Sequence, residues 1–321
     1  MVESKRIKYL DYIKGFALLL VILGHIYIPT NPVKIWLCSF HIPLFFMVSG
    51  FLANNKRIDI RITIKKKLKS LIIPYILFGL VFFIFKSKLN PSINLSIENY
   101  IFSLLTTSNL GALWFLPTLF IIEVVFNALN KLKLHDSIKI LITILLFLIG
   151  LNGNKYYINP YIIVLYRSLV GFGFFMLGKY SFKYIKKIDA PYIDIFFMLL
   201  VSIILSLKNG CVDLWGLVFY NKVLYVLCSV VGSFTVILFF KKISNKFDNI
   251  KLLNYIGLNS LIIMSTHQLI LDIINRITGA WGYSTLFGLV ICMIIIIIEV
   301  PIIYIINRYL PFMIGKFNKK V

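Results

Sequence analysis

LDYIKGFALLLVILGHIYIP, residues 10–29, is an apolar segment of twenty residues that contains two charges, Asp11 and Lys14. A hydrocarbon layer of ~30 Å is crossed by ~20 predominantly apolar residues in a helix. The segment therefore predicts a membrane-spanning helix. The charged residues before it lead into it without the small-residue cleavage site of a secretory signal, so we expect this helix to be retained.

The rest of the chain repeats this pattern. Of its 321 residues, 60% are hydrophobic and 14% are charged, and the mean hydropathy is +0.90. A net charge of +22 would suit a nucleic-acid binder, but apolar runs of this length exclude a soluble fold, and we expect no nucleic-acid partner. The pattern predicts an all-α polytopic membrane bundle of about ten transmembrane helices, forming one domain over residues 1–321. The predicted spans are residues 10–29, 35–53, 70–86, 111–130, 138–152, 160–178, 191–208, 216–240, 252–273 and 283–307.

The basic residues alternate between the two sides of these spans. With the N-terminus in the cytoplasm, 26 of the 34 Lys and Arg residues fall on the cytoplasmic side and 6 fall outside. Cytoplasmic loops of membrane proteins carry such an excess. We therefore expect both termini in the cytoplasm and attribute the net charge mainly to topology. The excess of Lys, Ile and Asn is typical of an AT-rich genome, which predicts a bacterial plasma membrane.

Two functional candidates share one face of the first span. Lys14 and His25 are eleven residues apart, which places them within ~20° on a helix and ~16 Å apart along its axis. Asp11 lies within ~40° of the same face. The helix would thus present a charge pair at the cytoplasmic edge and an imidazole at depth. Alternatively, Asp11 and Lys14 mark the membrane interface, and His25 hydrogen-bonds a neighbouring helix.

Two further histidines, His41 and His267, are expected at the depth of His25, in the outer half of the bundle. His41 suits helix-to-helix bonding or positioning better than catalysis. Pro43 frees a carbonyl near residue 39, and Gly50 allows a neighbouring helix to approach closely. The fourth histidine, His135, falls in a basic loop and is expected to be solvated.

Ionisable side chains inside the other spans are costly, so each is a candidate for function or pairing. Arg167, with Asp213 near the same mouth, would line a polar cavity in the outer half. Lys222 either joins them or reaches the headgroups. Glu123 and Glu299 are expected to pair with a cation or a hydroxyl. The cysteines have no paired or metal-type spacing, so we expect small core residues and neither a disulfide nor a metal site. They are Cys38, Cys211, Cys228 and Cys292.

A basic run, KKKLK at residues 65–69, precedes the third span. It is either a positive-inside anchor or a site that captures phosphates from the cytosol. The sequence contains no Gly-rich phosphate loop, no HExxH helix and no Ser-centred elbow. A nucleotide hydrolase, a zinc protease and a serine hydrolase therefore lack their required motifs.

Several motifs occur together in the order known from one family. They are RIKYLDYIKG at residues 6–15 with VILGH ending at His25, FHIPLFFMVSGFL at 40–52, IPY at 73–75 after the basic run, LWFLP at 113–117, and GLNS at 257–260 followed by His267. In this order the chain resembles the acyltransferase family 3 membrane proteins. The resemblance spans most of the sequence.

The resemblance implies a ten-helix bundle that transfers an acyl group, usually acetyl from acetyl-CoA, to a hydroxyl of an envelope glycan. The family's basic residue and histidine of the first span correspond to Lys14 and His25, and its paired basic residues correspond to Lys66 and Lys69. Lys14 keeps the charge of the Arg found in many members but not its bidentate geometry. Larger members carry an extracytoplasmic hydrolase-like domain, which we do not expect here.

The motifs and the helix geometry suggest one mechanism. Lys14, Lys66 and Lys69 would bind the phosphates of cytosolic acetyl-CoA, with Asp11 as the partner of Lys14. His25 would act at the thioester as general base, by direct transfer or through an acyl-histidine. Stabilisation of the oxyanion would come from His41, Arg167 or His267. No metal is implied.

The acceptor is less defined. A capsule or exopolysaccharide unit, a lipid-linked sugar, teichoic acid or peptidoglycan would fit, with Arg167, Trp114 and His267 as predicted substrate-binding residues, and the acyl group could be succinyl. Tryptophans at span ends either stack on sugar or anchor the helices at the interface. They are Trp36, Trp114, Trp215 and Trp281. The alternatives to an enzyme are a transporter or flippase of an envelope glycolipid and a non-catalytic scaffold, and binding of coenzyme A separates the enzyme from the transporter. The sequence does not specify an oligomeric state.

Overall fold

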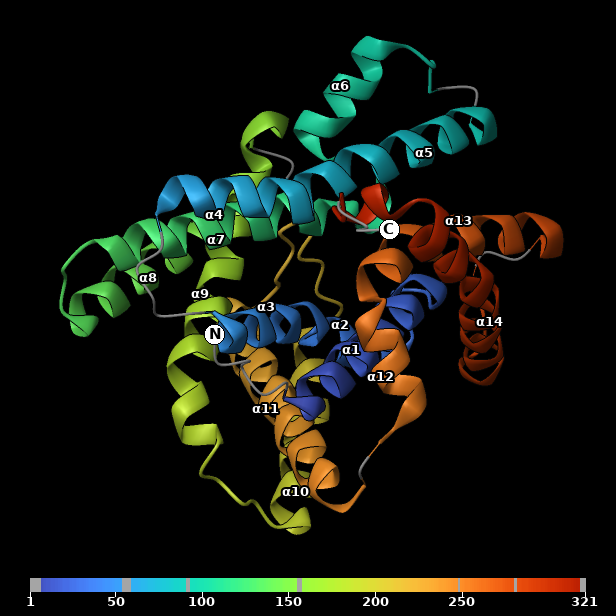
Figure 1. The fold of residues 1–321 in the computed structure, drawn as a ribbon. Helices are drawn as coiled ribbons and strands as arrows, with labels where there is room; N and C mark the ends of the chain where they lie inside the picture. Colours follow the sequence, from blue (N-terminus) through green and yellow to red (C-terminus); the bar gives the residue numbers. More distant parts are fainter. Residues whose placement is uncertain are drawn as a thin grey trace.

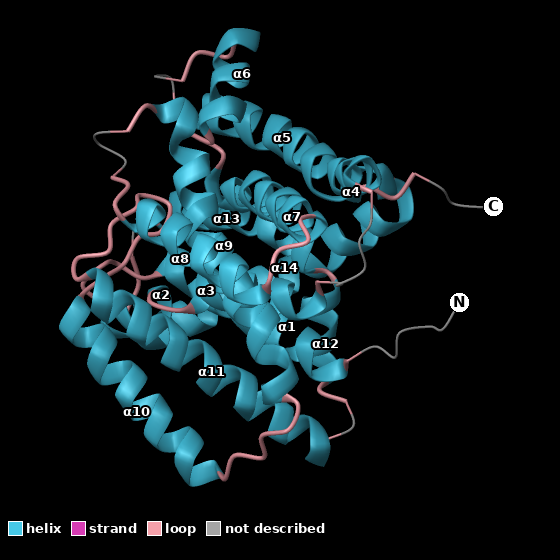
Figure 2. Cartoon of the chain, turned by 90° about the vertical axis from the view of Figure 1, so that its left-hand side faces the viewer, coloured by secondary structure: helices cyan, strands magenta, loops and turns pink. Residues whose placement is uncertain are grey.

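A computed structural model describes residues 7–53, 59–90, 93–154, 158–247, 249–279 and 282–317. In this part of the chain the regular structure is helical, and one isolated β-bridge joins Asp213 and Val218 (Figure 2). The α-helices are α1 (Lys8–Ile26), α2 (Pro32–Cys38), α3 (His41–Leu52), α4 (Ile60–Lys67), α5 (Ile73–Leu89), α6 (Ile97–Thr106), α7 (Phe115–Lys131), α8 (Asp136–Leu151), α9 (Ile163–Ile185), α10 (Tyr192–Asn209), α11 (Lys222–Lys246), α12 (Lys251–Leu258), α13 (Ser260–Thr278) and α14 (Thr285–Tyr309). A π-helical turn, η1 (Leu68–Ile72), joins α4 to α5, and short 3-10 turns are η2 (Gly111–Trp114), η3 (Pro160–Ile162) and η4 (Pro311–Ile314).

Eight helical segments of the described chain are long and apolar enough to cross a membrane, and the bent pair α12–α13 would make a ninth. The predicted all-α polytopic bundle is confirmed. All ten predicted spans contain helix, but several differ from the prediction in length or continuity. The 16 residues of α8 extend only ~24 Å, less than a ~30 Å hydrocarbon layer. The predicted ninth span bends by 87° between α12 and α13.

The helices form a bundle in which α10 and α11 lie at one edge and α5 and α6 at the opposite edge (Figures 1 and 2). Helices α1 and α3 lie between these edges. At Gly50 of α3 and Gly178 of α9, a Cβ atom would overlap the backbone of the facing helix. The close approach predicted for Gly50 is therefore confirmed, and it fixes α3 against α9.

The second predicted span is interrupted at Ser39 and Phe40, between α2 and α3. Pro43 has no N–H to offer the Ser39 carbonyl four residues earlier. The hydroxyl of Ser229 on α11 donates to that carbonyl instead, at 2.6 Å. The freed carbonyl that Pro43 predicts is therefore present and satisfied. The interruption makes His41 the first residue of α3.

The start of the eighth predicted span is wrong by six residues, because α11 begins at Lys222 and not at residue 216. The side chain of Asn221 caps the helix by accepting the N–H groups of Val223 and Leu224. Residues 210–221 therefore form a loop rather than helix. The Lys222 ammonium, at the helix end, donates to the Asn152 side chain at 2.6 Å.

Candidate active site

A cavity of about 590 Å³ lies where α1, α2, α3, η2, α13 and the 210–221 loop meet. Its polar lining includes His25, His41, Lys34, Asp213 and Gln268. The sequence predicts His25 and His41 in the outer half of the bundle and Asp213 near its outer mouth, and these three side chains meet in the cavity. The cavity is lined by Val21, Gly24, His25, Pro29, Lys34, Cys38, His41, Ile42, Phe45, Thr107, Asn109, Gly111, Ala112, Trp114, Phe115, Cys211, Val212, Asp213, Leu214, Trp215, Val218, Tyr220, Met264 and Gln268.

His25 belongs to the last turn of α1, and its imidazole is exposed to this cavity. The side-chain nitrogen of Gln268 on α13 lies 2.8 Å from its Nδ1 and 3.2 Å from its Nε2. The ring of His267 packs beside it, with centroids 5.3 Å apart. The structure thus brings His25 and His267 together, and it also gives His25 the contact to a neighbouring helix that the alternative interpretation required.

Gln268 is fixed from its other end. Its side-chain oxygen accepts the Ala112 N–H of η2 at 2.7 Å, so the amide nitrogen is directed toward His25. Gly111, whose φ of +55° favours glycine, leaves room for this arrangement, because a Cβ there would overlap the Gln268 oxygen. Gln268 was not predicted as a site residue, and its position next to His267 is the one signal in the sequence that points to it.

His41 and His267 are each anchored to their own helices. Nδ1 of His41 lies 2.7 Å from the Leu37 carbonyl, and Nδ1 of His267 lies 2.8 Å from the Ile263 carbonyl. Since a carbonyl only accepts, Nδ1 carries the proton in both rings, and Nε2 of a neutral imidazole is left as an acceptor. His41 lines the cavity, whereas His267 is fully buried behind His25, and its Nε2 has no hydrogen-bond partner among the described residues.

Arg167 lies behind the cavity wall and is only 1% exposed. Its guanidinium is centred 5.4 Å from the Trp114 ring and 5.3 Å from the Trp215 ring, and both rings line the cavity. It donates to the Trp215 carbonyl at 2.8 Å and to the Thr107 hydroxyl. Arg167 therefore holds the aromatic wall and the 210–221 loop in place. Trp281, another predicted aromatic, lies outside the described residues.

The predicted phosphate-binding residues lie away from this cavity. Asp11 is buried and lies 3.7 Å from the Lys14 ammonium, which is the predicted charge pair. Lys66 and Lys69 are exposed on α4 and η1, and the Lys69 ammonium lies 5.7 Å from the centre of the Phe317 ring. None of the three lysines lines the 590 Å³ cavity.

Glu123, which is half-buried, and Glu299, which is buried, have the partners that the sequence predicted. Glu123 accepts from Lys67 at 2.5 Å. Glu299, with no exposed surface, lies 2.7 and 2.9 Å from the Thr266 hydroxyl, one residue before His267. His135 is exposed and caps α8, as expected for a solvated residue.

The expectation that all four cysteines are small core residues is wrong for two of them. Cys228 and Cys292 are buried, but Cys38 and Cys211 both line the cavity and share a side-chain hydrogen bond. This hydrogen bond, aided by the Lys34 ammonium, lowers the pKa of Cys211 to about 7. The two residues are separated by 173 positions, and only the packing of the 210–221 loop onto α2 brings them together.

A second cavity of about 450 Å³ adjoins the first and shares Asn109, Gly111, Trp215 and Gln268 with it. Its wall carries an ion pair between Lys86 of α5 and Asp272 of α13, with N and O 2.6 Å apart. Asn90 and Arg276 complete the polar side. Neither the ion pair nor the second lobe was predicted from the sequence, because Lys86 and Asp272 are 186 positions apart in the chain.

Residues 7–306 match the acyltransferase domain that defines acyltransferase family 3. The chain belongs to this family. No curated protein and no solved structure matches it. The match covers nearly all the described chain, including the cavity and all its lining residues, and it makes this multi-pass protein a membrane acyltransferase.

Proposed function

We propose that this acyltransferase moves an acetyl group from cytosolic acetyl-CoA to a hydroxyl of a cell-envelope or exported glycan, in the plasma membrane of a bacterium. The observation that carries the proposal is the His25 imidazole, exposed in a cavity of the family's own domain and contacted by the Gln268 amide. An imidazole is suited to accept a proton from a hydroxyl near pH 7.

The transfer needs one proton to be moved and returned. The acceptor hydroxyl oxygen attacks the thioester carbonyl as its proton passes to His25. The C–S bond then breaks, and the coenzyme A sulfur takes the proton back from His25. A neutral imidazole has one lone pair, so the acceptor hydroxyl must displace the Gln268 N–H from the ring nitrogen that acts as base.

Once displaced from the ring, the Gln268 amide becomes a donor next to the reacting carbonyl. Gln side chains are among the groups that stabilise tetrahedral oxyanions. Gln268 is better placed for this role than Arg167, which is engaged with Trp215 and Thr107 behind the wall, or His267, which is buried behind His25. His41 lines the cavity with Nε2 as an acceptor and would orient the acceptor hydroxyl.

The cavity lining and the Lys14 end of α1 suit different substrates. The Trp114 and Trp215 rings and the ion-paired second lobe supply aromatic faces and polar groups, the chemistry that binds sugars. Lys14 lies on the same helix as His25, ~16 Å away by helix rise, a distance suited to an extended pantetheine arm. Coenzyme A phosphates would bind Lys14, Lys66 and Lys69.

The test is acetyl transfer in membranes. Membranes containing the wild-type protein, His25→Ala or the control His135→Ala are incubated with radiolabelled acetyl-CoA, and label is followed into the envelope glycan fraction. We expect label with the wild type and His135→Ala, whose imidazole is exposed on α8, and none with His25→Ala. Label that persists in His25→Ala refutes the catalytic role of His25. Folded wild-type protein that binds no coenzyme A and transfers no label favours the glycolipid transporter.

A further inference from the structure

A third cavity, of about 570 Å³, lies between α7, α8 and α9 and shares no residue with the two lobes of the candidate active site. Five of its lining residues are lysines, and one, Asp136, is acidic. The lysines are Lys139, Lys179, Lys183, Lys186 and Lys187. Three aromatic residues, Phe126, Tyr180 and Phe182, also line it.

Four of the five lysines come from the last turns of α9 and the residue pair that follows it. Lys179 is half-buried, with its ammonium 5.7 Å from the centre of the Phe126 ring and bonded to the Ala53 carbonyl. An ammonium has three donors, and this carbonyl takes one of them. Lys183, Lys186 and Lys187 are exposed nearer the surface.

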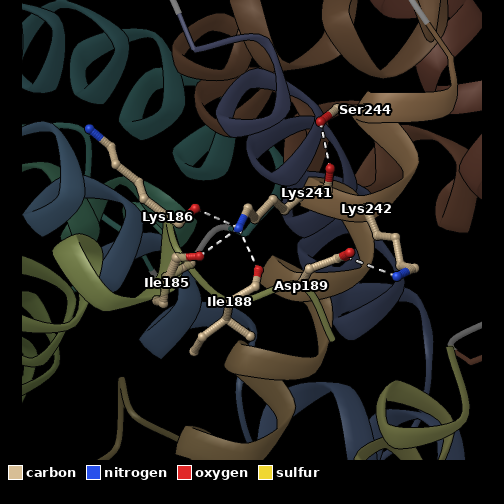
Figure 3. A network of polar contacts seen from close by, with 7 residues as sticks. All are labelled: Ile185, Lys186, Ile188, Asp189, Lys241, Lys242 and Ser244. Atoms are coloured by element: carbon tan, nitrogen blue, oxygen red, sulfur yellow. Dashed lines mark hydrogen bonds and ion pairs between the residues drawn. The ribbon is translucent and has the colours of Figure 1, made fainter. Parts of the chain in front are cut away.

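The turn that carries these lysines is held from behind by α11 (Figure 3). The Lys241 ammonium donates to the carbonyls of Ile185, Lys186 and Ile188 at 2.7, 2.9 and 2.5 Å. Lys241 thereby satisfies carbonyls that the end of α9 leaves without helical partners. In Figure 3 the Lys186 side chain extends away from the Lys241 ammonium. The backbone is thus fixed, and the Lys186 ammonium is directed elsewhere.

The acidic groups nearby do not balance this charge. Asp136 lies 3.6 Å from Lys139, at the cavity, while Asp189 pairs with Lys242 on the α11 side, 3.0 Å away. Among the residues that line the cavity, one carboxylate faces five ammonium groups. Like charges held this close repel one another, and an anion bound among them removes that repulsion.

We propose that this cavity binds a phosphate-bearing anion. Several flexible ammonium groups around a pocket suit the distributed charge of phosphate oxygens, and lysine binds phosphate as a point charge without requiring a fixed plane. The phosphate comes either from an anionic lipid headgroup at the membrane surface or from a soluble nucleotide. The aromatic lining accommodates the apolar part of either ligand. The site is separate from the His25 cavity, so the proposal does not depend on the acetyl transfer proposed above.

Binding is measured on the full chain in nanodiscs. One probe is phosphatidylglycerol, introduced into phosphatidylcholine nanodiscs and detected as lipid retained by the protein in native mass spectrometry. The other is ATP, a soluble nucleotide that is not the proposed acyl donor, titrated against the protein in pure phosphatidylcholine. The variant Lys183→Gln/Lys186→Gln/Lys187→Gln removes three cavity charges. The matched control, Lys133→Gln/Lys246→Gln/Lys251→Gln, removes three charges from exposed lysines that do not line the cavity.

We expect the cavity variant to weaken binding of one probe on the order of 100-fold, at about 1 kcal/mol per lysine, and the control to change it little. Loss of phosphatidylglycerol binding identifies a lipid headgroup as the source, and loss of ATP binding identifies a nucleotide. Equal losses in the two triple variants, or no binding of either probe to wild-type protein, would overturn the proposal. Circular dichroism and thermal unfolding check that both variants are folded.

Discussion

The proposed role of Gln268 gives the most specific prediction, because the oxygen and the nitrogen of its side-chain amide contact different groups. The oxygen accepts the Ala112 N–H at 2.7 Å, and the nitrogen lies 2.8 Å from His25. Gln268→Glu keeps an oxygen for Ala112 at the same chain length but removes the N–H donors. Gln268→Leu removes both. Comparing the two variants separates the effect on the fold from the effect on catalysis.

The magnitudes follow from these contacts. Ala112 is only 7% exposed, and leaving its buried N–H without an acceptor in Gln268→Leu costs about 1–3 kcal/mol of stability. Gln268→Glu avoids that loss. Removing one oxyanion donor lowers kcat by about 100- to 1000-fold, so we expect Gln268→Glu to be nearly inactive and as stable as the wild type.

The assay is initial-rate acetyl transfer from radiolabelled acetyl-CoA in membranes, combined with thermal unfolding of the purified variants. If Gln268→Glu keeps kcat within about threefold of wild type, Gln268 is not an oxyanion donor, since a threefold change is less than about 1 kcal/mol of barrier. If Gln268→Glu and Gln268→Leu lose the same stability, the hydrogen bond from Ala112 to the Gln268 oxygen does not stabilise the fold as stated.

Three other predictions concern residues around or beneath the site. Because the pKa of Cys211 is lowered to about 7, its alkylation by N-ethylmaleimide should rise between pH 6 and 8, as the thiolate forms, and level off above pH 8. Peptide mass spectrometry measures the rate. Cys38→Ala, which removes the hydrogen-bond donor, should move the rise to higher pH, and a rate still climbing beyond pH 9 contradicts the assignment. Glu299→Gln should preserve folding and activity, because the amide keeps an oxygen at the same chain length to accept the Thr266 hydroxyl. A fall in thermal stability as large as that of Glu299→Ala would show that a charge is needed there. Gly50→Ala should destabilise the bundle by about 1–3 kcal/mol, because its Cβ overlaps the α9 backbone. Gly79→Ala, whose Cβ would meet only side chains at 3.4 Å or more, is the control, and equal melting temperatures for the two variants would argue against tight α3–α9 packing.

Local features of the chain were predictable because their physical causes are local. The spacing of charges located ten segments that all contain helix, since a helix in the membrane must satisfy its backbone internally and keep charges at its ends, although it missed α4 and α6. Pro43 predicted the free Ser39 carbonyl, and Gly50 predicted a close helix contact. Glu123 and Glu299 predicted polar partners, because an isolated charge in the bundle is unfavourable.

Contacts between segments that are far apart in the sequence were not predictable. A hydropathy pattern also does not contain the 87° bend at Asn259 or the side-chain cap by Asn221 that starts α11 at Lys222. The pairing of Cys38 with Cys211, and the contact of Gln268 with both His25 and Ala112, join segments far apart in the chain.

The sequence by itself determined a helical membrane protein with His25 and Lys14 on one face of its first span. The helix period and the length of an apolar run that crosses the hydrocarbon layer can both be read from a single segment. Only the tertiary structure decided which groups surround His25, that Arg167 supports the cavity wall, and that five lysines gather around a separate cavity. Side chains meet according to how helices pack, and packing depends on the shapes of all the helices together.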